Sequence, residues 1–458
     1  MKIVCKYFKL KLVLLTIFLL ISFSVYAQEV EDSRRATIQY GTETEIASLI
    51  QALRAEKADY LDDDLIAVIA ATRNQRILTG VFGFFGEREK SGLEERAIRA
   101  ITERDEETNE TVLSALDYLG RVKSADAVPA MIELIDTEER RFLNNAFRAI
   151  GNASSSDPTL ANETAEFLVD FYNFREPGNE NRSTIIAAIG ATRSNAGVEL
   201  LVEIATNNDE RIPLRIAAIE ALSKIGSEDG LEAILAGVNT NDPNVRSAAV
   251  AALGPFSGET VDRAILDGFR DSFYRTRLAA AQASRERRLL AAVPYLRFRA
   301  ERDDVPNVKD EAIRALGAIA NEESLEVLSA LFTERKNTER VRILAAEMLM
   351  RNAAEQNFNQ LVIELDDAKA KNQTNLYNGL LRVVGETVVQ GDVMLNLARR
   401  FMQSGTVIEK LYGLDMAANN NLSTLREEII TLARDRNESI ARKARRIAEA
   451  LGIEIPQQ

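Results

Sequence analysis

The 458-residue sequence contains no histidine and no tryptophan, and its single cysteine is Cys5. Without histidine, and with its only thiol next to the N-terminus, the chain cannot assemble a Ser-His-Asp or Cys-His nucleophile, an HExxH zinc site or a thiolate zinc site. No GxxxxGK[ST] or strand-borne GxGxxG motif is present, which excludes the phosphate-binding loops of nucleotide-binding folds. The sequence therefore predicts no catalytic residue, no metal site and no cofactor.

Residues that interrupt helices are also scarce, with 9 Pro and 23 Gly, and aromatic residues make up only 6% of the chain. Hydrophobic residues reach 46%, which rules out a largely disordered protein, and the abundance of Ala, Leu and Ile suits closely packed helices. The formal net charge of −13 opposes binding to phosphate polymers, so we expect no nucleic-acid partner.

The first 27 residues have the layout of a secretory signal peptide. Four lysines precede an uncharged run at residues 12–25, and Val25 and Ala27 form an A-x-A-like cleavage site before Gln28. This run is shorter than the roughly 20 residues that span a bilayer, so we predict cleavage rather than an uncleaved anchor. Without these four lysines the net charge is −17. We predict an exported chain without a transmembrane segment, periplasmic in a bacterium because it lacks disulfides, with secretion as the alternative.

From residue 194 onward, segments of helical periodicity alternate with short polar turns, and the segments come in pairs. The second members of the pairs share a mostly basic column, spaced by 31 to 35 residues, at Arg182, Arg215, Arg246, Arg277, Lys309, Arg342, Tyr377 and Lys410. An alanine column follows three positions later. An acidic residue stands six positions earlier at Glu176, Asp209, Asp271 and Asp303, with Asp242 displaced by two.

These columns resemble the HEAT repeat, most closely at residues 244–254 (NVRSAAVAALG) and 307–317 (NVKDEAIRALG). The chain is similar to armadillo-like and bilin-lyase-like HEAT proteins, as an exported bacterial member. The resemblance implies an all-α, right-handed superhelical solenoid whose concave surface is lined by one layer of helices. It also implies a ladder of hydrogen bonds between the acid and the arginine of successive repeats. A physical argument predicts the same stacked architecture. A helix pair cannot bury its apolar face alone, so neighbouring pairs must supply the rest of the core.

We interpret the basic column as part of the scaffold, because a charge-assisted pair between repeats positions the stack. This structural ladder comprises Arg182, Arg215, Arg246, Arg277, Lys309 and Arg342 with Asp209, Asp271 and Asp303. The alternative is a cationic stripe that grips an anionic polymer, which would require unpaired arginines.

The register predicts about twelve helix pairs over residues 58–453, followed by a short tail at 454–458. A capping helix is expected at residues 42–57, because Thr42 and Glu45 have the spacing of a capping box. Residues 28–41 are polar and are expected to be flexible.

Two departures from the repeat supply candidate partner-binding residues. Residues 270–302 hold nine arginines against three acids, and we select Arg285, Arg287, Arg288, Arg297 and Arg299 as a docking site for an acidic segment, an anionic glycan or lipid headgroups. The alternative is that these arginines pair with acids of flanking repeats. The second departure is GVFGFFGE at residues 80–87, where Phe82 and Phe85 are either an exposed anchor for a partner or buried in an irregular repeat.

Clusters of acidic residues are the remaining candidates for catalysis or metal binding. Asp62, Asp63 and Asp64, or Asp366 and Asp367, could serve as general acid and base or bind calcium, but Asp62–Asp64 stand where a helix begins, and aspartate there caps free N–H groups. We therefore predict a non-enzymatic scaffold of the bacterial cell envelope that binds an extended segment of another protein on its concave face. Binding of an anionic glycan or lipid headgroup is the alternative, and a carboxylate-only hydrolase or an enzyme accessory subunit is the weaker one.

Overall fold

The computed structural model describes residues 28–175 and 178–456. Regular structure in these two ranges is entirely helical, without a strand, so the predicted all-α solenoid fold is confirmed. The chain divides into an N-terminal unit that ends at Ala233 and a C-terminal unit that begins at Ile234. The signal peptide predicted at residues 1–27 lies outside the described residues and stays a prediction. Over the described ranges, no helix has both the length and the apolar character required to cross a bilayer.

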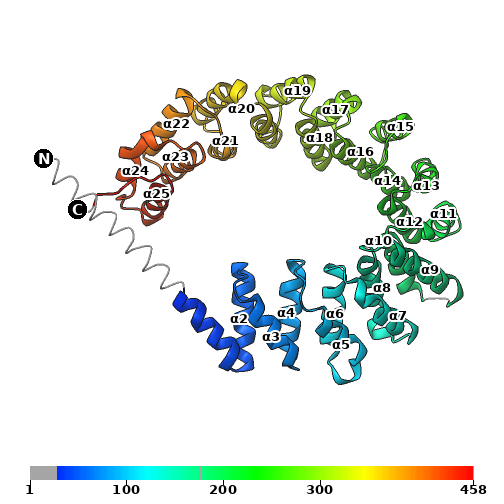
Figure 1. Ribbon diagram of the computed structural model, residues 1–458. Coiled ribbons are helices and arrows are strands. Elements are labelled where there is room, and N and C mark those ends of the chain that lie inside the picture. The colour runs from blue at the N-terminus through cyan, green and yellow to red at the C-terminus, as the bar shows by residue number, and fades with distance from the viewer. Residues whose placement is uncertain (1–27, 176–177, 457–458) are drawn as a thin grey trace. The chain divides into compact units, whose positions relative to one another are not determined.

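The N-terminal unit consists of two layers of helices (Figure 1). The first-helix layer contains α3 (Asp62–Ala71), α5 (Glu94–Thr102), α7 (Val128–Asp136), α9 (Pro158–Phe174) and α11 (Val198–Thr206). The second-helix layer contains α2 (Glu43–Glu56), α4 (Gln75–Glu87), α6 (Asn109–Arg121), α8 (Arg140–Ser154), α10 (Asn179–Thr192) and α12 (Ile212–Ile225). Helices of the second layer contact one another directly from α2 to α12. Short 3-10 helices at Arg104–Glu106, Ala125–Ala127 and Asn195–Gly197 lie in the turns.

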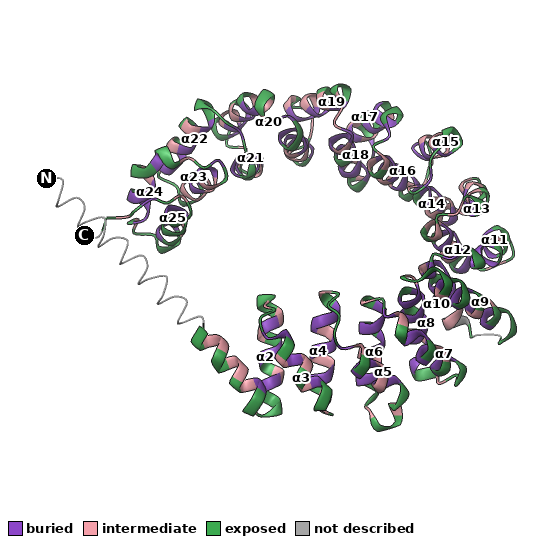
Figure 2. Ribbon diagram, in the orientation of Figure 1, coloured by how far each residue is buried: buried purple, intermediate pink, exposed green. Residues whose placement is uncertain are grey.

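The C-terminal unit repeats this arrangement, and α13 (Glu228–Val238) runs across the boundary between the units. Its first-helix layer contains α15 (Glu259–Gly268), α17 (Val293–Arg302), α19 (Glu322–Thr333), α22 (Asp392–Met402) and α24 (Arg426–Leu432). Its second-helix layer contains α14 (Pro243–Ala252), α16 (Tyr274–Arg287), α18 (Pro306–Ile319), α21 (Thr374–Glu386), α23 (Val407–Asn419) and α25 (Glu438–Ala450). Short 3-10 helices occur at Leu290–Ala292 and Ser423–Leu425. Figure 2 shows buried residues on the helix faces that meet between the layers.

The long helix α20 (Glu339–Ala370) serves both layers of the C-terminal unit. Its backbone leaves helical geometry at Ala353, with φ −147° and ψ 44°, and resumes as a second arm. The N-terminal arm follows α18 in the second layer, and the helix also packs against α21. Two helices that a turn would otherwise separate are therefore joined by a kink at one residue.

Residues 28–40 form a helix, which corrects the expectation of a flexible segment at 28–41. Arg34 Nη2 lies 2.8 Å from Glu56 Oε1, and Ile38 is buried. The polar composition was misleading because these side chains find partners on the folded repeats. The helix expected at 42–57 is α2, and its capping box is present: Glu45 N donates to Thr42 Oγ1 at 3.3 Å.

Glycines in the second-helix layer allow neighbouring helices to touch through their backbones. A Cβ built on Gly120 would lie 2.9 Å from the Cα of Ala149 on the next helix, and one on Gly190 would lie 2.6 Å from the Cα of Ala221. A Cβ on Gly151 would meet the carbonyl oxygen of Ala188 well inside van der Waals contact. The close approach of α6, α8, α10 and α12 therefore depends on the absence of these side chains.

The ladder contacts are present in the C-terminal unit. Arg246 Nε lies 2.7 Å from Asp271 Oδ2, and Arg277 Nε lies 2.7 Å from Asp303 Oδ2, in each case one repeat further along the chain. The same carboxylates accept backbone N–H bonds in their own turns, Asp271 from Phe273 and Asp303 from Val305. Each acid thus closes one turn and holds the arginine of the preceding repeat.

Other members of the basic column find different partners. Lys309 Nζ donates to the carbonyl oxygen of Glu301 at 3.1 Å, and Arg215 Nε donates to that of Ala205 at 3.2 Å. Arg342 reaches Glu364 on the second arm of α20 at 2.7 Å, because the acid-bearing turn is missing there.

At the N-terminal end of the predicted ladder the pattern also differs. The Arg182 guanidinium lies 5.3 Å from the centre of the Tyr172 ring. Asp209 is exposed and makes no ion pair within the described ranges, so the structure does not place it in a ladder contact. The acid at Glu176 falls outside the described residues.

The Tyr377 position of the column leads to a prediction about pH. Tyr377 donates a hydrogen bond to Glu409, which is 3% exposed and also accepts from Ser404 and from Lys369, the latter at 2.6 Å. Burial alone would raise the pKa of Glu409, but the hydrogen bonds from Lys369, Ser404 and Tyr377 outweigh it and lower the pKa to about 2.

A carboxyl group whose pKa is depressed on folding stabilises the protein above its unfolded pKa and loses that contribution as the pH falls. We expect Glu409 to contribute about 3 kcal/mol at pH 7 and to lose it progressively below about pH 4.5. The measurement is the difference in unfolding free energy between wild type and Glu409→Gln across this range. A difference that stays constant from pH 7 to pH 3.5 would contradict the assignment.

Candidate functional site

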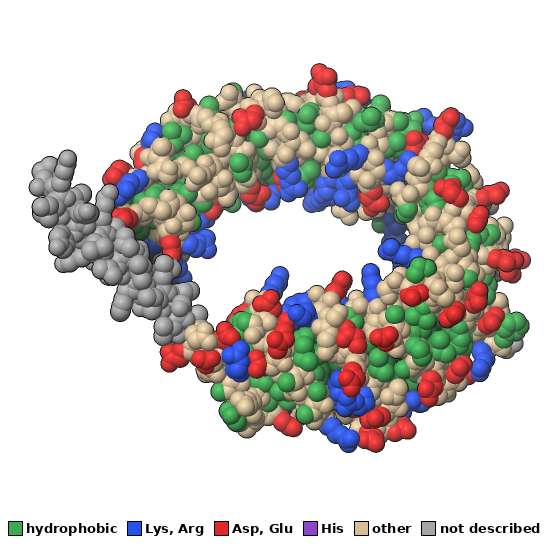
Figure 3. Space-filling model, viewed as in Figure 1, with side chains coloured by type: hydrophobic (Ala, Val, Ile, Leu, Met, Phe, Trp, Pro, Cys, Tyr) green, Lys and Arg blue, Asp and Glu red, His purple; other side chains and the backbone are tan. Residues whose placement is uncertain are grey.

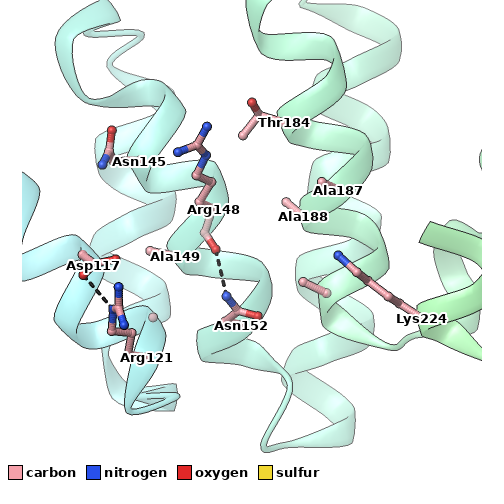
Figure 4. A pocket seen from close by; sticks show the side chains of 12 residues that line it. Asp117, Arg121, Asn145, Arg148, Ala149, Asn152, Thr184, Ala187, Ala188 and Lys224 are labelled. Atoms are coloured by element: carbon pink, nitrogen blue, oxygen red, sulfur yellow. Dashed lines mark hydrogen bonds and ion pairs between the residues drawn. The ribbon is translucent and has the colours of Figure 1, made fainter. Parts of the chain in front are cut away.

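A groove crosses the exposed face of the second-helix layer in the N-terminal unit (Figure 4). Its volume is about 400 Å³, and it extends over α6, α8 and α10 to the end of α12. The lining residues are Asp117, Gly120, Arg121, Asn145, Arg148, Ala149, Asn152, Thr184, Ala187, Ala188, Ala191 and Lys224. We call this surface the α6–α12 groove.

The floor of the α6–α12 groove is low because the packing of the layer requires small residues. Gly120 and Ala149 meet where α6 crosses α8, and Ala188 receives Gly151 where α8 crosses α10. Alanine at position 187 and at position 191 continues this floor along α10. The glycine and alanine contacts that bring the helices together thus also leave an open channel on their outer side.

The walls of the groove carry positive charge. Arg121 Nε forms an ion pair with Asp117 Oδ2 at 2.8 Å within α6. Arg148 and Lys224 are exposed, and the side chains of both lack an ion-pair partner among the described residues. Figure 4 shows the Arg148 side chain between α8 and α10, and Lys224 beyond α10. The groove therefore has two uncompensated cations in a chain that is acidic overall.

Polar groups without charge complete the lining. Thr184 Oγ1 donates to Asn144 Oδ1 at 3.0 Å, which fixes the hydroxyl at the edge of the groove. Asn152 Nδ2 makes a 3.4 Å contact with the carbonyl oxygen of Arg148. An amide carries both donors and acceptors, so Asn145 and Asn152 can bond the N–H and C=O groups of an extended peptide. None of these residues was predicted from the sequence as part of a site.

The C-terminal unit has a larger groove in its second-helix layer, but its charges are balanced. This groove has a volume of about 540 Å³ and is lined by Asp310, Arg314, Glu339, Arg340, Ile343, Leu344, Glu347, Asn375 and Arg382. Arg340 Nε lies 3.0 Å from Asp310 Oδ2, and Arg382 Nη2 lies 3.4 Å from Glu347 Oε2. Figure 3 shows basic side chains gathered along this side of the unit. Because acids that line this groove already bind Arg340 and Arg382, the groove offers less free positive charge than the α6–α12 groove does.

The arginines predicted as a partner-binding cluster do not form one free surface. Arg285 of α16 pairs with Glu311 of the next repeat, and Arg287 pairs with Asp262 on α15 of its own repeat, each at 2.6 Å. The Arg285 contact is the arrangement proposed above as the alternative to a docking site.

The other three members of the predicted cluster differ in their ion-pair partners. Arg297 and Arg299 belong to α17 and pair within that segment, with Glu301 at 3.0 Å and Asp303 at 3.3 Å. Arg288 is the C-cap residue of α16 and has a left-handed backbone with φ 49°. Its side chain forms no ion pair within the described ranges.

Phe82 and Phe85 are buried, which corrects their selection as partner-binding residues. Phe82 stacks on Tyr118 with ring centres 5.7 Å apart, and Phe84 is covered by the Arg88 guanidinium at 3.9 Å. All three phenylalanines of this segment can be buried because α4 contacts α2, α3 and α6, so several of its faces lie against neighbours. Two acids at the start of α3 are also structural, since Asp62 binds Arg88 at 3.1 Å and Asp64 binds Arg35 at the same distance.

Comparison with solved structures gives distant solenoid matches. The chain matches a crystal structure of Kap121p with 12% identity and a TM-score of 0.45, over 91% of this chain and 53% of that one. It matches Kap121p bound to the extreme C-terminus of the protein phosphatase Cdc14p with 12% identity and a TM-score of 0.46, over the same shares. For importin beta in an ammonium sulfate condition the identity is 13% and the TM-score 0.42, over 92% of this chain and 73% of that one. The chain thus spans about half the length of Kap121p.

No curated protein sequence matches the chain at a significant level. A family model described as spirochaete HEAT repeat protein matches residues 38–447, which includes all helices from α2 to α24 and most of α25. This match agrees with the paired helices and the acid–arginine contacts described above. The chain belongs to the spirochaete HEAT repeat protein family.

Proposed function

We propose that the protein is a non-enzymatic interaction scaffold of the cell envelope, exported through residues 1–27, and that the α6–α12 groove binds an extended segment of another protein. The observation that carries this proposal is the groove itself, with Arg148 and Lys224 free to bind carboxylates above a floor of glycine and alanine. HEAT-repeat solenoids present large surfaces of this kind to protein ligands.

An extended acidic segment fits the groove better than other ligands do. A peptide backbone can approach the small residues of the floor closely, and amides on α8 can bond it. Free cations on α8 and α12 then favour acidic side chains and orient the segment. An anionic glycan or lipid headgroup remains the alternative occupant, and salt distinguishes the two classes. Binding dominated by charge alone weakens steeply as ionic strength rises.

The experiment places a photo-cross-linking residue in the groove and reads the adducts. Ala187 is exposed on the floor, so Ala187→p-benzoylphenylalanine should capture a protein in cells that express the full chain. We expect the adduct to fall about tenfold when Arg148→Glu and Lys224→Glu are added, because two attractive contacts become repulsive. The matched control places the cross-linker at Glu199, which is exposed on α11 of the other layer.

Three results would contradict the proposal. One is an adduct that forms equally from position 199. Another is an adduct at position 187 that is insensitive to both charge reversals. The third is binding of an anionic polymer alone, abolished by moderate salt, which would favour the glycan or lipid alternative. Arg442→Glu, an exposed arginine on α25, controls for the change in net charge.

A further inference from the structure

A further concave surface lies in the first-helix layer of the C-terminal unit, between the end of α15 and the exposed side of α17. It has a volume of about 390 Å³ and is lined by Arg270, Pro294, Tyr295, Phe298 and Arg299. We call it the α17 pocket. It belongs to the first-helix layer of its unit, and no ladder arginine lines it.

The α17 pocket is apolar and its aromatic side chains are held in place. The Tyr295 ring stacks on the buried Phe269 ring, with centres 5.7 Å apart and an angle of 27° between the planes. Phe298, one turn further along α17, is 51% exposed, and Leu290 just before the helix is 61% exposed. A fixed ring beside an exposed ring offers a large apolar side chain a surface to cover.

The edges of the pocket are cationic. The Arg270 guanidinium lies 5.3 Å from the centre of the Tyr295 ring, and Arg299 lies 5.2 Å from that of Phe298. Arg302 lies 6.0 Å from the Phe298 ring, is exposed, and has no ion pair in the part of the chain that the structure describes. Arg270 is exposed too, although it contacts Asp267 at 3.1 Å. The aromatic surface is therefore flanked by guanidinium groups, of which Arg270 and Arg302 are exposed and can donate hydrogen bonds to carboxylates.

We propose that the α17 pocket is a docking site for an acidic protein segment, which inserts one aromatic or large aliphatic side chain against Tyr295 and Phe298 and places its carboxylates on Arg270 and Arg302. The apolar lining supplies the contact area for the anchor. The two guanidinium groups select acidic neighbours on either side of it.

The net charge of the chain disfavours an anionic membrane as the occupant. A chain of net charge −13 is repelled by anionic lipid outside this patch.

The test uses the full chain and a defined probe, the peptide Asp-Glu-Phe-Glu-Asp with its phenylalanine replaced by 4-fluorophenylalanine, observed by fluorine NMR. We expect the peptide signal to broaden and shift with wild type. The double variant Phe298→Ala/Arg302→Glu should bind about tenfold more weakly, the loss typical of removing an anchor contact. Both side chains are exposed, so the fold should be retained. Arg263→Glu, on the exposed side of α15, is the matched control and should bind as wild type does.

A second probe with lysine in place of the four acids should leave its fluorine signal unchanged. The proposal is overturned if the acidic peptide does not respond to wild type. It is also overturned if the double variant binds the peptide as wild type does, or if the lysine peptide binds equally well. Co-sedimentation of wild type with phosphatidylglycerol vesicles, lost in the double variant, would reassign the pocket to a membrane surface and likewise overturn it.

Discussion

Replacing Gly151 by valine is expected to destabilise the N-terminal unit by about 3 kcal/mol, because the new side chain has no space. The Cβ alone would lie 3.0 Å from the Cα and the carbonyl carbon of Ala188, and closer still to its carbonyl oxygen. The atoms in the way are backbone, so α8 and α10 would have to separate. Thermal unfolding measures the effect. Hydrogen exchange should then assign the faster opening to these two helices, since solenoid repeats unfold with their nearest neighbours.

The smaller change Gly151→Ala tests the direction of the effect. In an exposed helix interior, alanine in place of glycine stabilises by about 1 kcal/mol. At this position we expect the opposite direction, because contact between backbones outweighs helix propensity. Gly405→Val is the control, since nothing lies within 4 Å of a Cβ built on Gly405. If Gly151→Ala stabilised the protein, the close approach of α8 and α10 would not be a requirement of the fold.

The sequence was sufficient to predict the paired helices because the basic and alanine columns recur at a nearly constant interval. It also identified Arg246 and Arg277 as scaffold residues, since an acid stands at a matching position one repeat later. The prediction failed where the neighbouring repeat changes. Position 336, six residues before Arg342 where the next acid would stand, is a lysine, and Lys309 binds a backbone carbonyl instead.

The candidate sites could not be read from the sequence in the same way. A cluster of arginines is visible in one dimension, but whether each is paired depends on acids of other repeats, as Glu311 shows for Arg285. Conversely, Arg148 and Lys224 stand in segments without a charge cluster. That they lack an ion-pair partner among the described residues can be seen only in the folded structure. Phe82 and Phe85 were misjudged because a helix within two stacked layers buries several faces, which a single amphipathic stripe does not describe.

Substitution of Arg277 by alanine is expected to destabilise the C-terminal unit by about 3 kcal/mol or more, since it leaves a buried carboxylate without its main partner. The Arg277 side chain is 7% exposed and that of Asp303 is fully buried. Burial would raise the pKa of Asp303, but the hydrogen bond from Arg277 outweighs it and keeps the pKa below the ordinary aspartate value. Nη1 of the arginine also binds the carbonyl oxygen of Ser272 at 3.0 Å. Urea unfolding of wild type and variant gives the difference.

Graded comparisons separate burial of the ion pair from a general effect of lost charge. Arg246→Ala should cost less, about 1 to 3 kcal/mol, because the Arg246 side chain is 20% exposed and water can solvate what remains. Arg288→Ala should leave stability nearly unchanged. Adding Asp303→Asn to Arg277→Ala removes the uncompensated charge, so the double variant should recover part of the loss. Equal effects of all three arginine substitutions would mean that the ladder contacts do not carry the stability of the stack.

The folded-state pKa of Asp303 is depressed, so the stabilisation that its carboxylate gives is present above the ordinary aspartate pKa and disappears as the pH falls through the depressed value. The difference in unfolding free energy between wild type and Arg277→Ala should therefore become smaller as the pH falls below about 4.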